Sequence, residues 1–360
     1  MSIITKKKFG CLKDGREAFL YTIQNRRGTA LTVCDYGGHM QALKTQKQNG
    51  MIVDVVLGYD DIAVYEREDK YMGALIGRCS NRIAQGRLRV GSKVYQLECN
   101  NGANHLHGGE RTGFNKKLWQ AAVTEAGLKL TYTSPDGEGN YPGTLCVTVW
   151  YDVTEDNAVT IRYEAFSDAD TICNLTNHTY FNLNGYTSGS VLHQQIQLFA
   201  DAFTETDCES LPNGIIRDVT GTPMDLRKLT PIGRHIEDEY DQLKWVQGYD
   251  HNWVIRQEPC HAPVSDYMDM GLHKMAYAVG DQTGITLTAY TTQPGVQFYT
   301  GNYLDGQPAG KGGVSFDRRC GFCLEAQYFP NAPAHPNFLQ PFLKKGELWK
   351  AQTIYALNCQ

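Results

Sequence analysis

The 360-residue sequence lacks any apolar run close to the roughly 20 residues that a membrane-spanning helix requires. Lysines 6, 7 and 8 are not followed by an apolar segment, so no secretory signal peptide is visible. The net charge is −5 with both signs mixed along the chain, which excludes the basic stripe typical of nucleic-acid binding. We therefore expect a cytoplasmic protein with neither a membrane nor a nucleic acid as partner.

The motifs of nucleotide and covalent chemistry are missing too. No G-x-G-x-x-G or P-loop pattern follows a predicted strand, and no G-x-S-x-G pattern is present. The 11 cysteines, an odd number, form no framework, and Cys320 and Cys323 are a C-x-x-C pair without a second pair. We therefore expect free thiols in a reducing compartment, and we expect no nucleotide cofactor, serine nucleophile or zinc site.

Helical periodicity is scarce, and an alternation of apolar and polar residues with period two dominates. Only residues 62–68 and a few turns in 232–245 suggest short helices. Strands are predicted at 128–132, 145–151, 159–165 and 285–289, with turns at 134–137 and 156–157. Many antiparallel strands without intervening helices indicate an all-β fold, a large antiparallel β-sandwich. With no linker or repeat visible, we expect a single domain over residues 1–360.

The segment 321–330 places one carboxylate, Glu325, inside a run typical of a buried strand. Phe322 and Leu324 are apolar, and Pro330 ends the run. A buried ionised group loses its hydration, and hydrogen bonds or a function must offset that loss. We interpret Glu325 as a catalytic base whose partner is a histidine far upstream in the sequence.

Two glycine-framed segments interrupt the strand pattern. In 77–86, Asn81 and Arg82 are adjacent, so both reach one site only if the backbone is irregular there; a surface turn is the simpler alternative. In 100–109, His105 and His107 are two residues apart and can share a face, with Glu110 close by. That spacing suggests a rim loop with binding groups or a metal, or one structural and one exposed histidine.

Three further polar positions are candidates. His178 lies in 174–183, where polar residues precede it and apolar ones follow; a hydrogen-bonded core histidine is the alternative. Asp250, in 248–253, has two oxygens that can accept two neighbouring hydroxyl groups, although Asp also favours turns. Gln297 shares a strand face with Tyr299.

Together these segments resemble the aldose 1-epimerases, or galactose mutarotases. Eight pieces occur in the family's order, which makes the resemblance highly specific, and they span most of the chain. The sequence departs from the family pattern at Cys79-Ser80, where an aromatic residue and an alanine often stand, at Tyr328, where histidine is common, and at Leu348-Trp349. The eight pieces are residues 81–86, 104–109, 134–143, 177–183, 221–225, 248–252, 292–295 and 321–330.

The resemblance implies a galactose mutarotase-like sandwich with a sugar cleft, no metal and no cofactor. It implies an isomerase that interconverts the α and β anomers of aldohexoses such as galactose and glucose, as a monomer or homodimer. By motif position Glu325 corresponds to the general base, His178 to the general acid and His107 to the other site histidine. The positions that correspond to sugar-binding residues are Asn81, Arg82, Asp250 and Gln297.

Three alternatives stay open at the level of sequence. A non-catalytic sugar-binding protein can use the same scaffold, since fold does not fix function. An enzyme for sugar phosphates requires an extra basic cluster, which these segments do not show. A metal-dependent cupin-type sugar enzyme would take as ligands His105, His107, Glu110 and His178.

Overall fold

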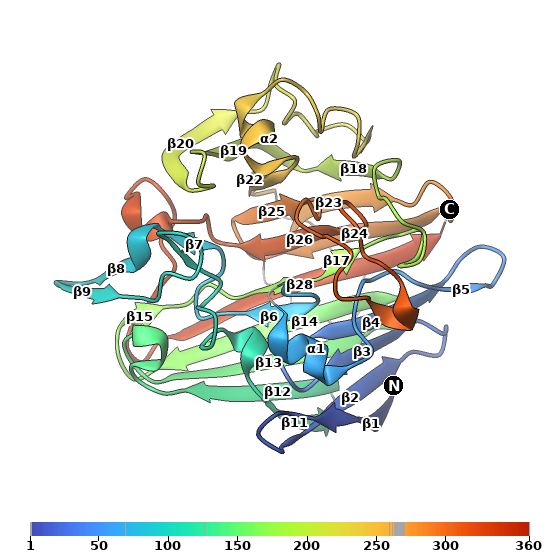
Figure 1. Ribbon diagram of the computed structural model, residues 1–360, viewed down its shortest axis with the longest axis horizontal. Helices are drawn as coiled ribbons and strands as arrows, with labels where there is room; N and C mark the ends of the chain where they lie inside the picture. Colours follow the sequence, from blue (N-terminus) through green and yellow to red (C-terminus); the bar gives the residue numbers. More distant parts are fainter. Residues whose placement is uncertain are drawn as a thin grey trace.

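The largest element of the fold is a nine-stranded antiparallel sheet. The computed structural model describes residues 2–68, 70–125, 127–258, 260, 262 and 271–359. The long strands of this sheet run side by side across the molecule in Figure 1, with β14 and β28 in the middle. In order across the sheet, the strands are β11 (Gln120–Thr124), β12 (Gly127–Ser134), β13 (Leu145–Val153), β14 (Ala158–Ser167), β28 (Leu348–Cys359), β24 (Ile285–Thr291), β23 (His273–Val279), β18 (Gln195–Leu198) and β21 (Thr230–Pro231).

A six-stranded antiparallel sheet packs on this large sheet. Tyr355 of β28 donates a hydrogen bond from its hydroxyl to the carbonyl of Leu324, at 2.9 Å, and its ring lies 5.0 Å from that of Phe181. These contacts place the main core between the two sheets, as expected of a β-sandwich. The strands of the second sheet, in order, are β17 (Tyr180–Phe181), β26 (Phe322–Gln327), β25 (Gly295–Tyr299), β22 (Asp250–Ile255), β19 (Ala200–Thr206) and β20 (Pro212–Asp218).

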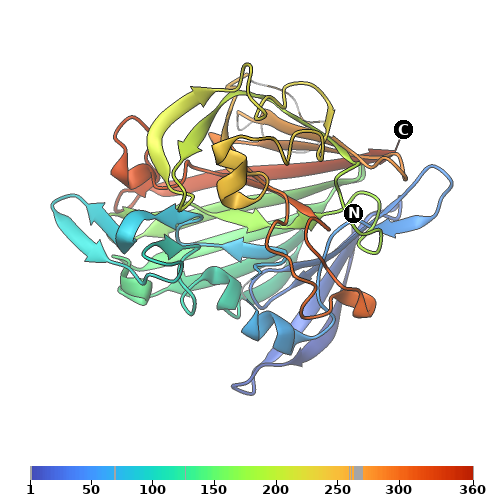
Figure 2. The ribbon, with the colours of Figure 1, turned by 45° about the horizontal axis from the view of Figure 1, so that its top comes forward.

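The N-terminal residues form a five-stranded sheet at one side of the molecule, drawn blue in Figure 2 beside the green strands of the large sheet. Leu31 and Val33 of β3 are fully buried in the main core, so this sheet extends the sandwich. Its strands are β1 (Ile3–Cys11), β2 (Glu17–Gln24), β3 (Ala30–Cys34), β4 (Met40–Gln46) and β5 (Ile52–Asp54).

The remaining elements are short. Two α-helices, α1 (Ile62–Arg67) and α2 (Asp241–Val246), lie in the two regions that the sequence predicts for helices. Within the described part of the chain, no helix combines the length and apolar character that a membrane crossing requires. Paired strands connect the sheets: β6 (Ala74–Ile76) with β16 (Thr176–His178), β7 (Arg82–Ile83) with β10 (His105–Leu106), β8 (Arg87–Val90) with β9 (Lys93–Gln96), and β15 (Thr171–Ile172) with β27 (Phe342–Leu343). Single 3₁₀ turns occur at Ala84–Gly86, Phe114–Lys116, Glu138–Asn140, Lys311–Gly313 and Ala332–Ala334.

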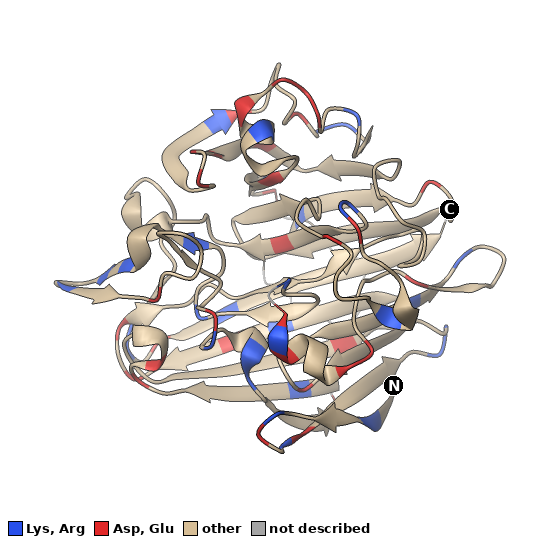
Figure 3. Ribbon diagram, in the orientation of Figure 1, with Lys and Arg blue, Asp and Glu red and all other residues tan. Residues whose placement is uncertain are grey.

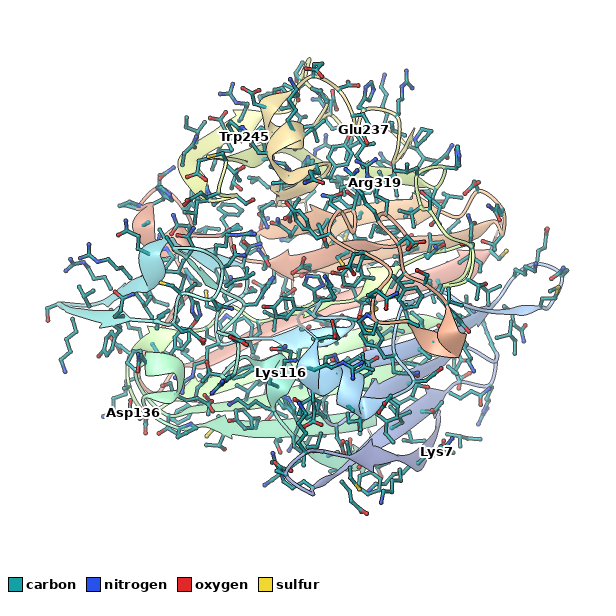
Figure 4. All side chains as sticks on the ribbon, in the orientation of Figure 1. Lys7, Lys116, Asp136, Glu237, Trp245 and Arg319 are labelled. Carbon is teal, nitrogen blue, oxygen red and sulfur yellow. The ribbon has the colours of Figure 1, made fainter. Side chains whose placement is uncertain are left out.

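The end of α1 is held by one lysine. Lys116, labelled in Figure 4, donates hydrogen bonds from its ammonium group to the carbonyls of Tyr65, Glu66 and Glu68, at 2.9, 3.0 and 2.6 Å. The last carbonyls of a helix have no partner within the helix, and a cation there also opposes the negative end of the helix dipole. This contact fixes the start of the segment that follows α1, which reaches the functional site.

The charged side chains follow no single-sign pattern. In the view of Figure 3, blue and red segments are interspersed over the ribbon, as the sequence indicates. Within the described residues, Lys311 and Asp54 form a buried ion pair: Lys311 Nζ lies 2.7 Å from Asp54 Oδ2, with side-chain exposures of 5% and 10%. Lys311 also donates to the carbonyl of Gln41 at 2.8 Å, so the pair ties the 311–313 turn to β4 and β5.

Removing one partner of this pair leaves the other charge buried alone. We therefore expect Lys311→Met to lower the free energy of unfolding by about 3–5 kcal/mol in urea denaturation. The double variant Lys311→Met/Asp54→Asn removes both charges and keeps an oxygen for the amide of Leu43, so it should recover part of the loss. A single variant as stable as the wild type would show that the pair does not fasten the turn.

Candidate active site

A cavity of about 830 Å³ opens beside the six-stranded sheet. Segments far apart in the sequence line it: the turn after α1, the two glycine-framed segments, β16, β22 and β26. Of the site residues predicted from the sequence, those that line the cavity are Asn81, Arg82, His107, His178, Asp250 and Glu325. The structure therefore brings six of the seven candidates to one place.

Strand β26 places its carboxylate by simple alternation. Phe322, Leu324 and Ala326 pack into the main core, so Cys323 and Glu325 point to the opposite face. Glu325 lies at the wall of the cavity with only 2% of its surface exposed. Its Oε2 atom makes no hydrogen bond to any described residue, so one oxygen of a buried carboxylate remains available to a ligand.

The neighbouring strands continue this polar face. Gln297 of β25 pairs with Glu325, and Tyr299 of β25 pairs with Asp250 of β22. The amide of Gln297 donates from Nε2 to Asp250 Oδ1 at 2.8 Å. Gln297 itself is buried outside the lining of the cavity, so in this structure it contacts Asp250 and not the open space.

His178, the last residue of β16, faces Glu325. Its Nε2 atom lies 3.6 Å from Glu325 Oε1, and its Nδ1 atom lies 3.5 Å from the thiol sulfur of Cys323. Both the imidazole and the carboxylate are buried. The structure thus places next to each other two residues that are 147 positions apart in the sequence.

A backbone hydrogen bond determines which ring nitrogen of His107 carries the proton. The amide N–H of Asn81 donates to His107 Nδ1 at 3.1 Å, so Nδ1 is an acceptor and a neutral ring carries its proton on Nε2. The rings of His107 and His178 lie 5.4 Å apart. His107 has a φ of 52°, in the left-handed region that few non-glycine residues adopt.

His105 does not share this site, so of the two alternatives that the spacing leaves open, the shared face does not hold and His105 is a structural histidine. The left-handed turn at His107 breaks the strand alternation that a shared face requires. His105 is buried, with Nε2 2.6 Å from the hydroxyl of Tyr141 and Nδ1 2.6 Å from the carbonyl of Glu98. It is a core histidine.

The pair Asn81 and Arg82 requires an irregular backbone, and the structure confirms it. Asn81 has a φ of 61°, which turns both side chains toward the cavity. The side-chain oxygen of Asn81 accepts a hydrogen bond from the amide of Arg82 at 2.9 Å. Arg82 Nε donates to Asn101 Oδ1 at 3.0 Å, which orients the guanidinium group.

Burial dominates the electrostatics of the site. It raises the pKa of Glu325 well above the usual value, the neighbouring Asp250 raises it further, and Arg82 opposes both effects. Burial lowers the pKa of His178 to about 4, and it lowers the pKa of His107 well below its usual value, with His178 and Arg82 adding to the effect. In the unliganded protein the carboxyl–imidazole pair therefore favours its uncharged form.

A metal ion is a chemical possibility because His107, His178 and Glu325 offer ligand atoms that lie within 4.8 Å of one another. However, a metal-binding histidine usually donates its second ring N–H to an acceptor. His107 does the reverse, since its second nitrogen accepts a backbone N–H. The donor set therefore does not fit a metal site, and the cupin-type set fails as well because His105 lies elsewhere.

Several residues that line the cavity were not predicted from the sequence, namely Arg67, Lys70, Tyr71, Trp245 and Tyr303. Trp245 lies on α2, where Figure 4 labels it. These residues lie in the two short helices and in loops, and their spacing in the sequence does not indicate a ligand-binding site. Tyr328, a departure from the family pattern, lies outside the cavity lining.

The fold and the site define a β-sandwich protein with a buried carboxyl–imidazole pair at the wall of a cavity lined by polar side chains. The aldose 1-epimerase family profile matches residues 20–356. Galactose mutarotase of Bos taurus is 39% identical over 361 residues, 99% of each chain. Aldose 1-epimerase of Escherichia coli (strain K12) is 32% identical over 345 residues, 95% of this chain and 96% of the relative.

Solved structures show the same likeness. Galactose 1-epimerase from Lactobacillus acidophilus NCFM superposes with a TM-score of 0.83 and 26% identity, and covers 100% of this chain and 99% of that chain. The protein belongs to the aldose 1-epimerase family. This confirms the family and the all-β fold that the sequence motifs predict.

The backbone contact at His107 predicts a single tautomer. At pH 7 we expect ¹⁵N NMR of imidazole-labelled protein to show Nδ1 of His107 without a proton and Nε2 with one, because the ring is neutral there and Nδ1 accepts an N–H. His105 provides an internal comparison of a buried histidine with other partners. A proton on His107 Nδ1 would contradict the assignment and reopen the metal-binding alternative.

Proposed function

We propose that this protein is a mutarotase that interconverts the α and β anomers of aldohexoses such as galactose and glucose. The observation that carries the proposal is the distance of 3.6 Å between His178 Nε2 and Glu325 Oε1. The C1 hydroxyl and the ring oxygen of a pyranose are bonded to the same carbon. A base and an acid that serve these two oxygens can therefore lie only a few ångström apart, as this pair does.

The reaction needs one proton removed and one supplied. Glu325 takes the proton of the C1 hydroxyl while His178 gives a proton to the ring oxygen, and the bond between C1 and the ring oxygen breaks to leave an open-chain aldehyde. Rotation about C1–C2 presents the other carbonyl face, and reclosure returns both protons. No proton, electron or group is consumed overall.

The other cavity residues bind the sugar in this proposal. His107 is neutral and holds its proton on Nε2, so it donates a hydrogen bond to a sugar oxygen beside His178. Arg82 and Asn81 donate to hydroxyls, and Asp250 accepts from them. Gln297 acts through Asp250, whose carboxylate it orients by a hydrogen bond. Such positioning keeps the open chain in place until it recloses.

Two alternatives receive less support from the site. A sugar-phosphate enzyme requires free cations, but the basic residues at the rim already have acidic neighbours: Arg67 lies 3.4 Å from Glu68, and Lys70 lies 3.5 Å from Asp305. A purely sugar-binding protein does not require a carboxyl group and an imidazole paired at the cavity wall. The cytoplasmic location stays a proposal, supported by buried thiols such as Cys173 and Cys323.

Glu325→Gln tests the assigned base. The amide cannot accept a proton, so we expect the rate of anomerisation to fall by about 100-fold to 10,000-fold while sugar binding persists. Polarimetry of freshly dissolved α-galactose and α-glucose measures the rate, and calorimetry with the sugar measures the binding.

Glu164→Gln is the matched control, since Glu164 pairs with Lys350 at the surface, far along the large sheet. It undergoes the same chemical change and should keep the wild-type rate. A Glu325→Gln variant that anomerises sugars normally would remove this residue from the mechanism. A wild-type protein that binds sugars without anomerising them would instead support the purely sugar-binding alternative.

The pH profile should be bell-shaped, because the Glu325–His178 pair works only while it holds one proton. On the acid side, activity falls as His178, whose pKa burial lowers to about 4, takes up a second proton. On the alkaline side, activity falls when the shared proton leaves, well above the usual range of a glutamate because burial raises the pKa of Glu325. A rate that stays flat from pH 3 to pH 11 would contradict the Glu–His assignment.

A further inference from the structure

Three tyrosine rings surround the imidazole of His178. The ring centroids of Tyr180, Tyr71 and Tyr299 lie 5.0, 5.7 and 6.1 Å from that of His178. They come from three separate segments: β17, the turn between α1 and β6, and β25. All three residues line the cavity. We call this group the tyrosine cage.

The two buried hydroxyls of the tyrosine cage are used elsewhere. The hydroxyl of Tyr180 donates to the carbonyl of Lys70 at 3.0 Å, and the hydroxyl of Tyr299 accepts the amide N–H of Tyr303 at 3.1 Å. Each ring is thereby fixed by its distant end, and the aromatic body remains next to His178. Tyr71 also packs on His107, with ring centroids 4.7 Å apart, so it joins the two site histidines.

The other groups around His178 do not favour its protonated form equally. On β26, Glu325 lies 3.6 Å away and favours the cation when it is ionised, while Cys323 keeps a neutral thiol because burial raises its pKa. His107 is neutral. Asp250, Arg82 and Lys70 line the cavity with charges of both signs, and burial opposes the cation.

The Glu325 carboxylate alone is not a reliable means of stabilising the imidazolium form of His178. Glu325 Oε1 lies 3.6 Å from His178 Nε2, so before the reaction the carboxylate can take the imidazolium proton itself and return the pair to its uncharged form. Aromatic rings keep their negative faces throughout, and a cation over such a face, within about 6 Å of the ring centroid, is attracted to it. The planes of Tyr180 and Tyr71 are tilted by 41° and 35° to the imidazole, and the plane of Tyr299 by 67°. We propose that the tyrosine cage stabilises the imidazolium form of His178 through cation–π interactions, which makes Tyr71, Tyr180 and Tyr299 positioning residues of the general acid.

This inference rests on the proposed acid role of His178, but its test does not. Tyr71 is the best position to change because it is only half-buried and lies in a turn, whereas the other two rings are buried in strands. Tyr71→Leu removes the ring and keeps apolar bulk, and Tyr71→Phe removes only the hydroxyl. Both variants keep a side chain at the same left-handed position, φ 54°, so backbone strain is matched.

The measurement is an NMR titration of the His178 ring in a Glu325→Gln background, where the neighbouring carboxyl cannot titrate. Loss of the signal in His178→Asn assigns it. We expect Tyr71→Leu to raise the acid dissociation constant of His178 about three- to tenfold, and Tyr71→Phe to leave it unchanged. Tyr299→Leu and Tyr299→Phe repeat the comparison on an independent ring, and they decide the matter if Tyr71→Leu does not fold.

The direction of the change separates the two physical effects of a ring. A cage that stabilises charge makes His178 a stronger acid when a ring is lost, whereas a ring that only excludes water makes it a weaker acid when lost. The proposal would be overturned if His178 had the same acid dissociation constant in the Leu and Phe variants, or a smaller one in the Leu variants. With Glu325 intact, kcat should fall about three- to tenfold in Tyr71→Leu with KM retained.

A separate activity measurement tests the proposed function. A His178→Asn variant that anomerises galactose at the wild-type rate would refute the acid role of His178. The NMR titration would still report whether the rings stabilise its cation, because that measurement uses an inactive background and no substrate.

Discussion

The burial of one carboxyl group constrains the whole site. Glu325 lies on a strand whose alternate residues fill the core between two sheets, so its position cannot adjust without disturbing that core. A charge there is expensive unless something offsets the lost hydration. The surrounding residues supply the offset in part: Arg82 favours the ionised form, and His178 provides a proton partner at 3.6 Å. Burial therefore favours the uncharged form of the pair.

Regular strands and irregular turns contribute differently to the site. The sheets give a rigid face on which Asp250 and Glu325 lie at fixed register positions. The residues that complete the site come from tight turns in which Tyr71, Asn81 and His107 all adopt left-handed φ values of 54°, 61° and 52°. Such conformations cost of order 1–3 kcal/mol each and persist only where the surroundings hold them. At this site the sandwich is the support, and the strained turns are what it holds in place.

Much of the fold was predictable because it depends on local pattern. The alternation in 128–132 and 145–151 and the short periodic stretch at 62–68 correspond to β12, β13 and α1. The motif order also predicted six residues of the cavity. The spacing of His105 and His107 could not decide between a shared face and a structural histidine, because a spacing of two residues places side chains together only on a regular strand, and one left-handed residue removes that condition. Arg67, Lys70 and Trp245 were not predictable because they reach the cavity through long-range packing, which leaves no periodicity in the sequence.

The hydrogen bond from the amide of Asn81 to His107 has an evolutionary consequence. The donor belongs to the main chain, so every amino acid except proline at position 81 supplies it. Point substitutions in the surrounding side chains therefore cannot easily switch which edge of that imidazole is the donor. Substitutions of the neighbouring side chains can change which sugar the cavity prefers, whereas a change of the His107 tautomer requires a different path of the backbone. The path of the backbone thus limits which new chemistries this scaffold can acquire by gradual mutation.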